Sequence, residues 1–143
     1  MPVPAMVKMS VARSSFTEAR ISTGVRNPTE ERLIAAAKAR LDALDFYPRP
    51  VRTSRVRILH APWWFRLPIL NRFVGYAIGP LILVKRPLEQ VSEDLIAHEL
   101  THVWQVQHDG LWMWLSYLYL GYDHNPYELM ARDAARSRHT GAP

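Results

Sequence analysis

The sequence predicts a small α+β domain in which a short antiparallel sheet packs on helices. Two capped helical patterns, at residues 28–44 and 92–107, flank a central region of short apolar runs separated by turn residues. The chain has 143 residues, the length of one domain, and such a domain buries roughly two-thirds of the surface that its unfolded chain exposes. We therefore expect one domain over residues 28–137, with an arm at 1–27 and a tail at 138–143.

The composition excludes several classes of protein. With 48% hydrophobic and 22% charged residues, the chain is neither disordered throughout nor built from membrane-spanning helices. The absence of cysteine excludes a disulfide scaffold. The net charge of +5 comes from arginines that follow no nucleic-acid-binding motif, a distribution typical of a solvated surface, so we expect no nucleic-acid partner.

Residues 1–27 contain prolines, serines and threonines but no sustained apolar run, and we expect a flexible arm. A secretory signal needs an apolar core of roughly 7 to 15 residues, and the stretch 3–11 is interrupted by proline, lysine and serine. The apolar stretch 63–84 contains two arginines, whose burial in a bilayer would be costly. These observations predict a cytoplasmic location, and export by a route that needs no signal stays open.

The first helix is predicted over residues 28–44. Asn27-Pro28-Thr29-Glu30 resembles a helix start, with a capping side chain, a proline near the first position and an acid in the first turn. The apolar residues that follow recur at helical spacing: Leu33, Ile34, Ala37, Leu41 and Leu44. We expect a packing element.

Three short segments predict the sheet. Residues 55–60 read as a strand, and the runs 73–78 and 81–84 are separated by the turn Gly79-Pro80, which predicts a hairpin. The aromatic cluster Trp63-Trp64-Phe65 between these segments is expected to be a core or lid element.

The stretch from Ile96 to Gln105 contains an HExxH motif, formed by His98, Glu99 and His102. Ser92 and the acids that follow it predict that a helix starts just before the motif. On a helix the two histidines lie about 40° apart in projection and one turn apart along the axis, so both can reach one metal ion. Zinc is the expected ion, and Glu99 lies where a general base could hold the attacking water.

Residues 111–122 are rich in tryptophan and tyrosine and too few to cross a bilayer. We expect a buried helix there, and the alternative is a helix that lies in a membrane interface. Asn125-Pro126 then predicts the start of a last helix, in which small residues such as Ala131 and Ala135 would allow close packing.

A catalytic zinc needs three protein ligands, and two residues compete for the third place. Glu128 is the only glutamate after the motif and lies in the first turn of the last helix. His108 follows His102 by six residues, which on a continuous helix means a rotation of about 240° away from the site. We therefore favour Glu128, and keep Asp123 and His124 as weaker candidates.

The motif His98-Glu99-Leu100-Thr101-His102-Val103-Trp104-Gln105, followed by Asn125-Pro126-Tyr127-Glu128, resembles short bacterial zincin-like domains with a HELTHVxQ helix, metallopeptidases of the gluzincin type. The resemblance covers residues 94–135. It implies a zincin-like fold, one Zn²⁺ ion bound by the histidines and Glu128, and Glu99 as the catalytic acid and base. Some relatives of this kind are Vgr-related or secretion-associated proteins.

The sequence departs from the gluzincin pattern four residues after the third ligand. The pattern places there an aspartate that orients the first histidine, whereas this chain has Arg132 with Asp133 beside it. Candidates for orienting a ligand or stabilising the oxyanion are therefore Asp133, Arg132, Tyr127, His124 and Tyr122.

These observations predict a zinc-dependent peptidase that acts on a peptide or protein. The run Leu81, Ile82, Leu83 and Val84 is expected to be an exposed sheet edge that pairs with an extended substrate. One alternative is a noncatalytic zinc-binding or partner-binding module of a secretion apparatus, in which His124 could fill the fourth zinc position. Peripheral contact with a membrane is the least favoured reading.

Overall fold

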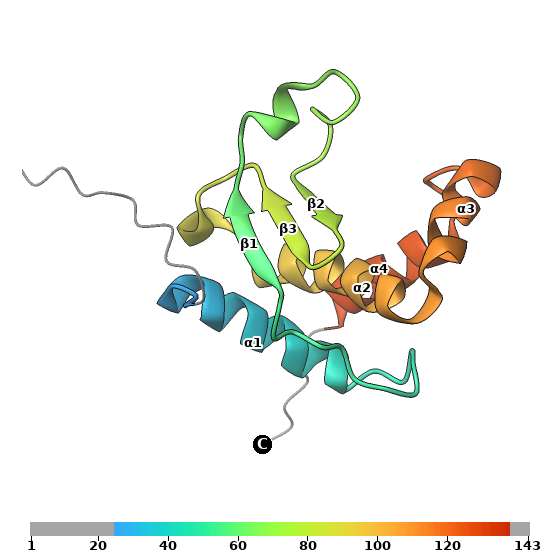
Figure 1. Cartoon of the computed structure of the whole chain (residues 1–143), viewed down its shortest axis with the longest axis horizontal. Coiled ribbons are helices and arrows are strands. Elements are labelled where there is room, and N and C mark those ends of the chain that lie inside the picture. The colour runs from blue at the N-terminus through green and yellow to red at the C-terminus, as the bar shows by residue number, and fades with distance from the viewer. Residues whose placement is uncertain (1–24, 138–143) are drawn as a thin grey trace, which may run out of the picture.

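The computed structural model describes residues 25–137, so most of the arm and the whole tail expected from the sequence lie outside the described residues. Within this range the elements follow the order α1 (Pro28–Asp42), β1 (Arg57–His60), η1 (Trp64–Arg66), β2 (Gly75–Ile78), β3 (Leu81–Val84), η2 (Leu88–Gln90), α2 (Glu93–Asp109), α3 (Leu111–Leu120) and α4 (Pro126–Arg136). The predicted α+β class is confirmed. Helices α1 and α4 and the sheet pack around α2, and α3 stands at one end of the molecule (Figure 1).

The sheet is mixed rather than antiparallel, and its strand order is β1-β3-β2. β2 and β3 form the predicted antiparallel hairpin, but β1 pairs with β3 in parallel, with Ile58 opposite Ile82. The prediction that Leu81, Ile82, Leu83 and Val84 form an exposed edge is therefore wrong. β3 is the central strand, and its unbroken apolar run is typical of a strand covered on both faces. The edge strands of the described sheet are β1 and β2.

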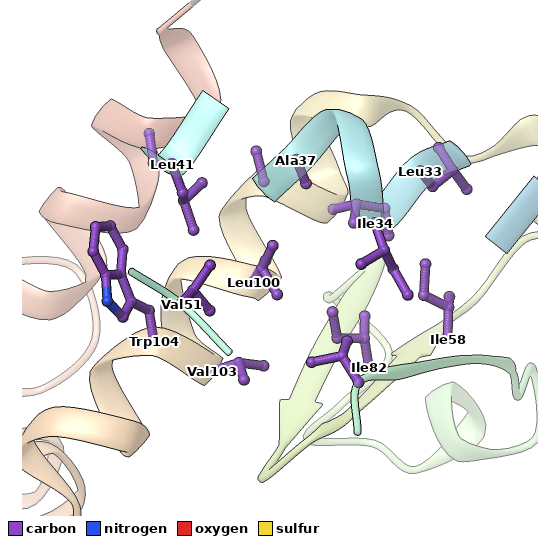
Figure 2. Close-up of a cluster of buried hydrophobic side chains, with 14 of the residues drawn as sticks. Leu33, Ile34, Ala37, Leu41, Val51, Ile58, Ile82, Leu100, Val103 and Trp104 are labelled. Carbon is purple, nitrogen blue, oxygen red and sulfur yellow. The ribbon is translucent and has the colours of Figure 1, made fainter. Parts of the chain in front are cut away.

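The main core lies between α1, α2 and the sheet (Figure 2). Apolar residues of α1, among them Leu33 and Leu41, pack on Leu100 and Trp104 of α2 and on Ile82 of the sheet, and all are buried. The indole nitrogen of Trp104 donates to the carbonyl of Arg49 at 2.8 Å, so the largest core side chain has no unpaired polar atom. This core fixes the helix that carries the HExxH motif.

The first helix begins as predicted. The side chain of Asn27 accepts a hydrogen bond from the backbone nitrogen of Glu30 at 2.8 Å and caps α1. The buried carboxylate of Glu30 in turn accepts from the backbone nitrogen of Ile58 at 2.8 Å and from the guanidinium of Arg57 at 2.9 Å. Glu30, which the sequence predicts as an acid in the first turn of the helix, thus also links α1 to strand β1.

The sequence predicts a buried helix at residues 111–122, and the prediction that this helix is buried is wrong. α3 forms, but Met113 is its only buried residue, and the exposed side chains include Leu111, Trp112, Leu118 and Tyr119. A helix that is apolar on every side has no pattern that tells which face packs, so composition alone favoured the interior. No described helix is long and apolar enough to cross a membrane.

The aromatic cluster before β2 divides between core and surface. Phe65 is buried with Ala61 and Leu83 in a small second core, whereas Trp63 is 59% exposed. The segment 63–74 therefore covers one face of the sheet and also projects apolar side chains into solvent.

Candidate metal centre

Helix α2 carries the HExxH motif without interruption. The hydroxyl of Ser92 accepts from the backbone nitrogen of Leu95 at 3.2 Å, which caps the helix, and the helix continues to Asp109. The two motif histidines therefore lie one turn apart on one face. The same continuity turns His108 away: its ring stacks on Tyr47 with centroids 4.5 Å apart, and its Nδ1 lies 3.0 Å from the carbonyl of Trp104. His108 thus points away from His98 and His102, as the helical rotation predicts.

Helix α4 brings Glu128 to the histidines. Asn125 caps this helix by accepting from the backbone nitrogen of Tyr127 at 2.9 Å, and its amide donates to the hydroxyl of Ser116 on α3 at 2.9 Å. Ala131 and Ala134 are fully buried on the side that faces α2, and Ala135 is only half-buried. These small side chains allow the two helices to approach closely, so Glu128 in the first turn reaches the motif face.

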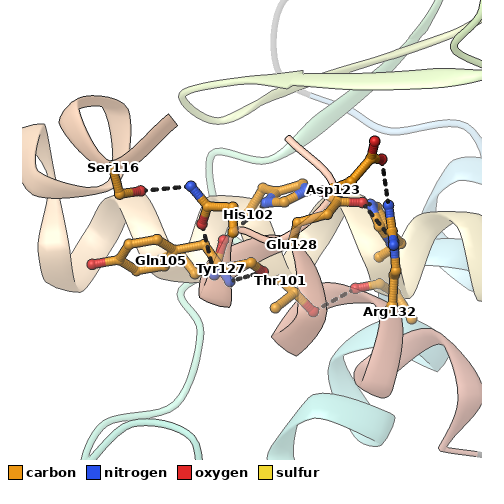
Figure 3. A network of polar contacts seen from close by, with 11 residues as sticks. Thr101, His102, Gln105, Ser116, Asp123, Tyr127, Glu128 and Arg132 are labelled. Carbon is orange, nitrogen blue, oxygen red and sulfur yellow. Dashed lines mark hydrogen bonds and ion pairs between the residues drawn. The ribbon is translucent and has the colours of Figure 1, made fainter. Parts of the chain in front are cut away.

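The three predicted ligand side chains converge on one point, and Figure 3 shows two of them, His102 and Glu128. The Nε2 atoms of His98 and His102 are 3.3 Å apart, and the carboxylate oxygens of Glu128 lie 3.4 Å and 3.3 Å from them. Two ligands at tetrahedral zinc, each bonded at about 2.0 to 2.1 Å, are about 3.3 to 3.4 Å apart. In addition, Oε2 of Glu128 is buried and accepts no hydrogen bond from any described residue. The residues therefore fit a zinc ion.

Gln105 sets the tautomer of His102. Its amide nitrogen donates to the backbone carbonyl of Tyr127 at 2.7 Å, and its amide oxygen lies 2.8 Å from Nδ1 of His102. A carbonyl only accepts, so the amide nitrogen must face Tyr127 and the amide oxygen must face His102. Nδ1 of His102 therefore carries a proton, so in the neutral ring the lone pair lies on Nε2, the nitrogen that faces Glu128 and His98. Gln105 is fully buried, so this orientation is held firmly.

The charge states of the ligands suit a cation. Burial and the neighbouring His102 lower the pKa of His98 to about 4, so its imidazole is neutral at pH 7. Burial alone would raise the pKa of Glu128, but the contacts with His102 and His98 outweigh it and hold that pKa at about 2. Burial alone would lower the pKa of His102, but the contact with Glu128 outweighs it and raises that pKa, so a metal ion must displace a proton from this ring. His98 and Glu128 already present a neutral imidazole and an ionised carboxylate, which are donors that Zn²⁺ takes.

Glu99 lies between α2 and strand β2 and is 5% exposed. Burial and, to a smaller extent, the negative charge of Glu128 raise the pKa of Glu99 to about 7, while His102 opposes the shift. The close approach to β2 depends on Gly75, because a Cβ atom at that position would lie 2.8 Å from Oε1 of Glu99. Gly75 is therefore required for space rather than for an unusual backbone conformation.

A cleft of about 270 Å³ opens onto His98, Glu99 and His102. Its walls are the segment 69–77, which includes most of β2, and the inner face of α3. Three tyrosines line it, Tyr76, Tyr117 and Tyr122, and burial together with the negative charge of Glu128 raises the pKa of Tyr117 and Tyr122. Both phenols therefore remain protonated at neutral pH and keep a donor that can face a substrate oxygen.

The other residues that the sequence suggested for the site lie in different places. Arg132 donates to Oε1 of Glu128 at 3.2 Å and pairs with Asp123 at 3.7 Å, so it contacts the ligand carboxylate (Figure 3). Asp133 is exposed and belongs neither to the convergent group nor to the residues that line the cleft. His124 is also exposed and lies outside the convergent group.

Tyr127 contributes through its backbone rather than through its hydroxyl. Its carbonyl accepts from Gln105, whereas burial and the carboxylate of Asp109 raise the pKa of its phenol, which therefore lies toward Asp109 and not toward the ligands. Tyr122 is the one oxyanion candidate from the sequence whose side chain lines the cleft.

Sequence reasoning missed three residues of the site. Gly75 had a signal, because an isolated glycine inside a strand pattern indicates a close approach of another group. Tyr117 follows the buried Met113 by four residues on α3, but an all-apolar helix hides that face. Gln105 ends the motif segment, but nothing in that segment indicates that its amide reaches the backbone of another helix.

Comparison with protein-family models, with curated proteins and with solved structures finds no match to this chain.

Proposed function

We propose that the chain is a zinc-dependent peptidase, of the gluzincin-like kind that the motif resembles. The observation that carries the proposal is the convergence of His98, His102 and Glu128 at zinc spacing, at the inner end of a cleft that also contains Glu99. Only three side chains of the described residues converge, which matches the three protein ligands and one open position of a catalytic zinc site.

The chain's own groups supply the proton transfers of peptide hydrolysis. Bound Zn²⁺ would polarise the scissile carbonyl and lower the pKa of a water molecule toward neutrality. Glu99 accepts a proton from that water as its oxygen forms the new bond to the carbonyl carbon. It then passes the proton to the amine nitrogen as the C–N bond breaks. A pKa of about 7 suits a group that must first accept and then donate near neutral pH.

Binding of the substrate would use β2 and two of the tyrosines. β2 is an edge strand of the described sheet and lines the cleft, so an extended peptide can pair with β2 there. The central strand β3, which the sequence suggested for this role, has both edges paired. The hydroxyls of Tyr117 and Tyr122 are donors in the cleft that could stabilise the oxyanion. Arg132 is already engaged by Glu128 and Asp123.

Metal analysis combined with a peptidase assay tests the proposal. The purified protein should contain one equivalent of zinc, which His98→Ala, His102→Ala and Glu128→Ala each lose. Glu99→Gln should keep the metal and lose cleavage of a mixed peptide library. Metal content that is unchanged in all three alanine variants would contradict the site itself.

A noncatalytic zinc-binding or partner-binding module, as in a secretion apparatus, is the second candidate. The exposed apolar surface of α3 favours it, because a partner could cover that surface. Zinc that binds while the wild-type protein and Glu99→Gln both leave every library peptide intact would select this candidate.

A further inference from the structure

α3 exposes an apolar surface that no described residue covers. Trp112, Leu118 and Tyr119 are 74%, 81% and 85% exposed. The helix contains no acidic or basic residue, although a surface helix normally carries charges on its solvent side. Its inner face is occupied, since Met113 is buried and Ser116 bonds to the cap of α4. The exposed side is therefore free for a function other than folding.

The opposite wall of the cleft has the same character. The segment 63–74 exposes Trp63, Leu67 and Ile69, and Ile69 lines the cleft together with Trp114 of α3. We call residues 63–74 and 111–120 together the apolar rim. The only charged side chains in the rim are Arg66 and Arg72, and both are exposed. The rim thus combines protruding apolar and aromatic side chains with positive charge and contains no carboxylate.

We propose that the apolar rim docks on the surface of a bilayer that contains anionic phospholipids. Tryptophan, tyrosine and leucine on a short helix, with arginines beside them, are the composition of elements that lie in a membrane interface. The arginines complement anionic headgroups, and the net charge of +5 acts in the same direction.

The shape of the rim favours lipid over a protein surface. A protein interface surrounds its apolar centre with polar residues and needs a complementary hollow on the partner. The rim instead presents exposed apolar side chains from two separate segments, and a bilayer accepts such side chains without a matching shape. No described helix could cross the membrane, so the contact is peripheral. Docking would turn the mouth of the cleft toward the headgroups.

Vesicle binding of the full chain tests the proposal without reference to catalysis. Vesicles of phosphatidylcholine with phosphatidylglycerol should bind the protein, and raised salt should weaken that binding. The double variant Trp112→Ser/Leu118→Ser should bind at least about tenfold more weakly, because two apolar side chains no longer leave water. Both residues are exposed, so thermal unfolding should stay unchanged, and Leu129→Ser on α4, 48% exposed, is the matched control that keeps binding.

A second pair of variants tests the charge. Arg66→Gln/Arg72→Gln should weaken binding to the anionic vesicles, whereas the exposed pair outside the rim, Arg55→Gln/Arg86→Gln, should weaken it less. Wild-type protein that stays in solution with both anionic and phosphatidylcholine vesicles would overturn the proposal. It would also be overturned by a dimer that the Trp112→Ser/Leu118→Ser variant dissociates, since the rim would then bind a second copy of the chain.

Discussion

The amide oxygen of Gln105 lies 2.8 Å from Nδ1 of His102, and this contact decides which ring nitrogen faces His98 and Glu128. The orientation of the Gln105 amide is itself fixed, because its nitrogen donates to a backbone carbonyl of α4 at 2.7 Å. One buried side chain thus connects α2 and α4, the helices that carry the proposed ligands, and holds a proton on Nδ1 of His102.

Gln105→Leu should lower zinc affinity by about 10- to 100-fold, the usual effect of removing a partner that orients a ligand histidine. Gln105→Glu retains an acceptor for Nδ1 but no longer donates to the Tyr127 carbonyl, so it should lose stability while keeping more of the affinity. Competition with a chromogenic chelator measures the affinity. Equal affinity losses in the two variants would mean that packing, and not the tautomer, matters.

Gly75→Ala should reduce peptidase activity by about 100-fold, because the new Cβ would lie 2.8 Å from Oε1 of Glu99 and displace the carboxylate. The metal content should not change, since the atoms nearest to the new Cβ belong to Glu99 and Leu95 and not to the three proposed ligands. Gly79→Asn in the turn of the same hairpin is the control, because that position has open space around it and asparagine tolerates its positive φ. Full activity in Gly75→Ala would show that Glu99 need not approach the strand.

The parts of the structure that could be predicted are those that depend on neighbours in sequence. The caps at Asn27, Ser92 and Asn125 act within a few residues, and the convergence of the motif histidines follows from helical geometry. The position of Glu128 beside the motif could be predicted, because it is the only glutamate after the motif and a cap places it in the first turn of a helix.

The parts that could not be predicted depend on pairing between distant segments. The run 81–84 has the same composition at an edge or at the centre of a sheet, and only the arrival of β1 beside it makes it central. The burial of α3 was equally undetermined, because each of its faces is apolar. The role of Gln105 could not be predicted, because it depends on the carbonyl of Tyr127, which belongs to another helix.

The metal-free protein should become less stable as the pH rises, through Glu99. Its pKa is about 7 in the fold and about 4.5 as the ordinary value, so between these values the folded state holds more protons than the unfolded state. The contribution of Glu99 to stability is complete below pH 4.5 and is lost as the pH rises through 7. Between pH 5 and pH 8 this loss amounts to about 2 to 3 kcal/mol.

Urea unfolding in the presence of a chelator measures this effect. Other groups titrate in the same range, so the free energy of unfolding of the wild type is compared with that of Glu99→Gln at each pH. From pH 5 to pH 8 the wild type should lose stability relative to the variant. A difference that stays constant with pH would show that Glu99 is not buried in an uncharged form.

Asn125→Ala should affect both stability and metal binding, because Asn125 caps the helix that presents Glu128 and also binds Ser116 of α3. Loss of a cap costs about 0.5 to 2 kcal/mol, and the hydroxyl of Ser116 loses a partner as well. Asn27→Ala is a matched control, since it removes the equivalent cap from α1, which carries no ligand. Asn27→Ala should lower the free energy of unfolding by a similar amount and leave zinc affinity unchanged, whereas Asn125→Ala should lower both. Equal zinc affinity in the two variants would mean that contacts along α2, and not the cap, hold Glu128 in place.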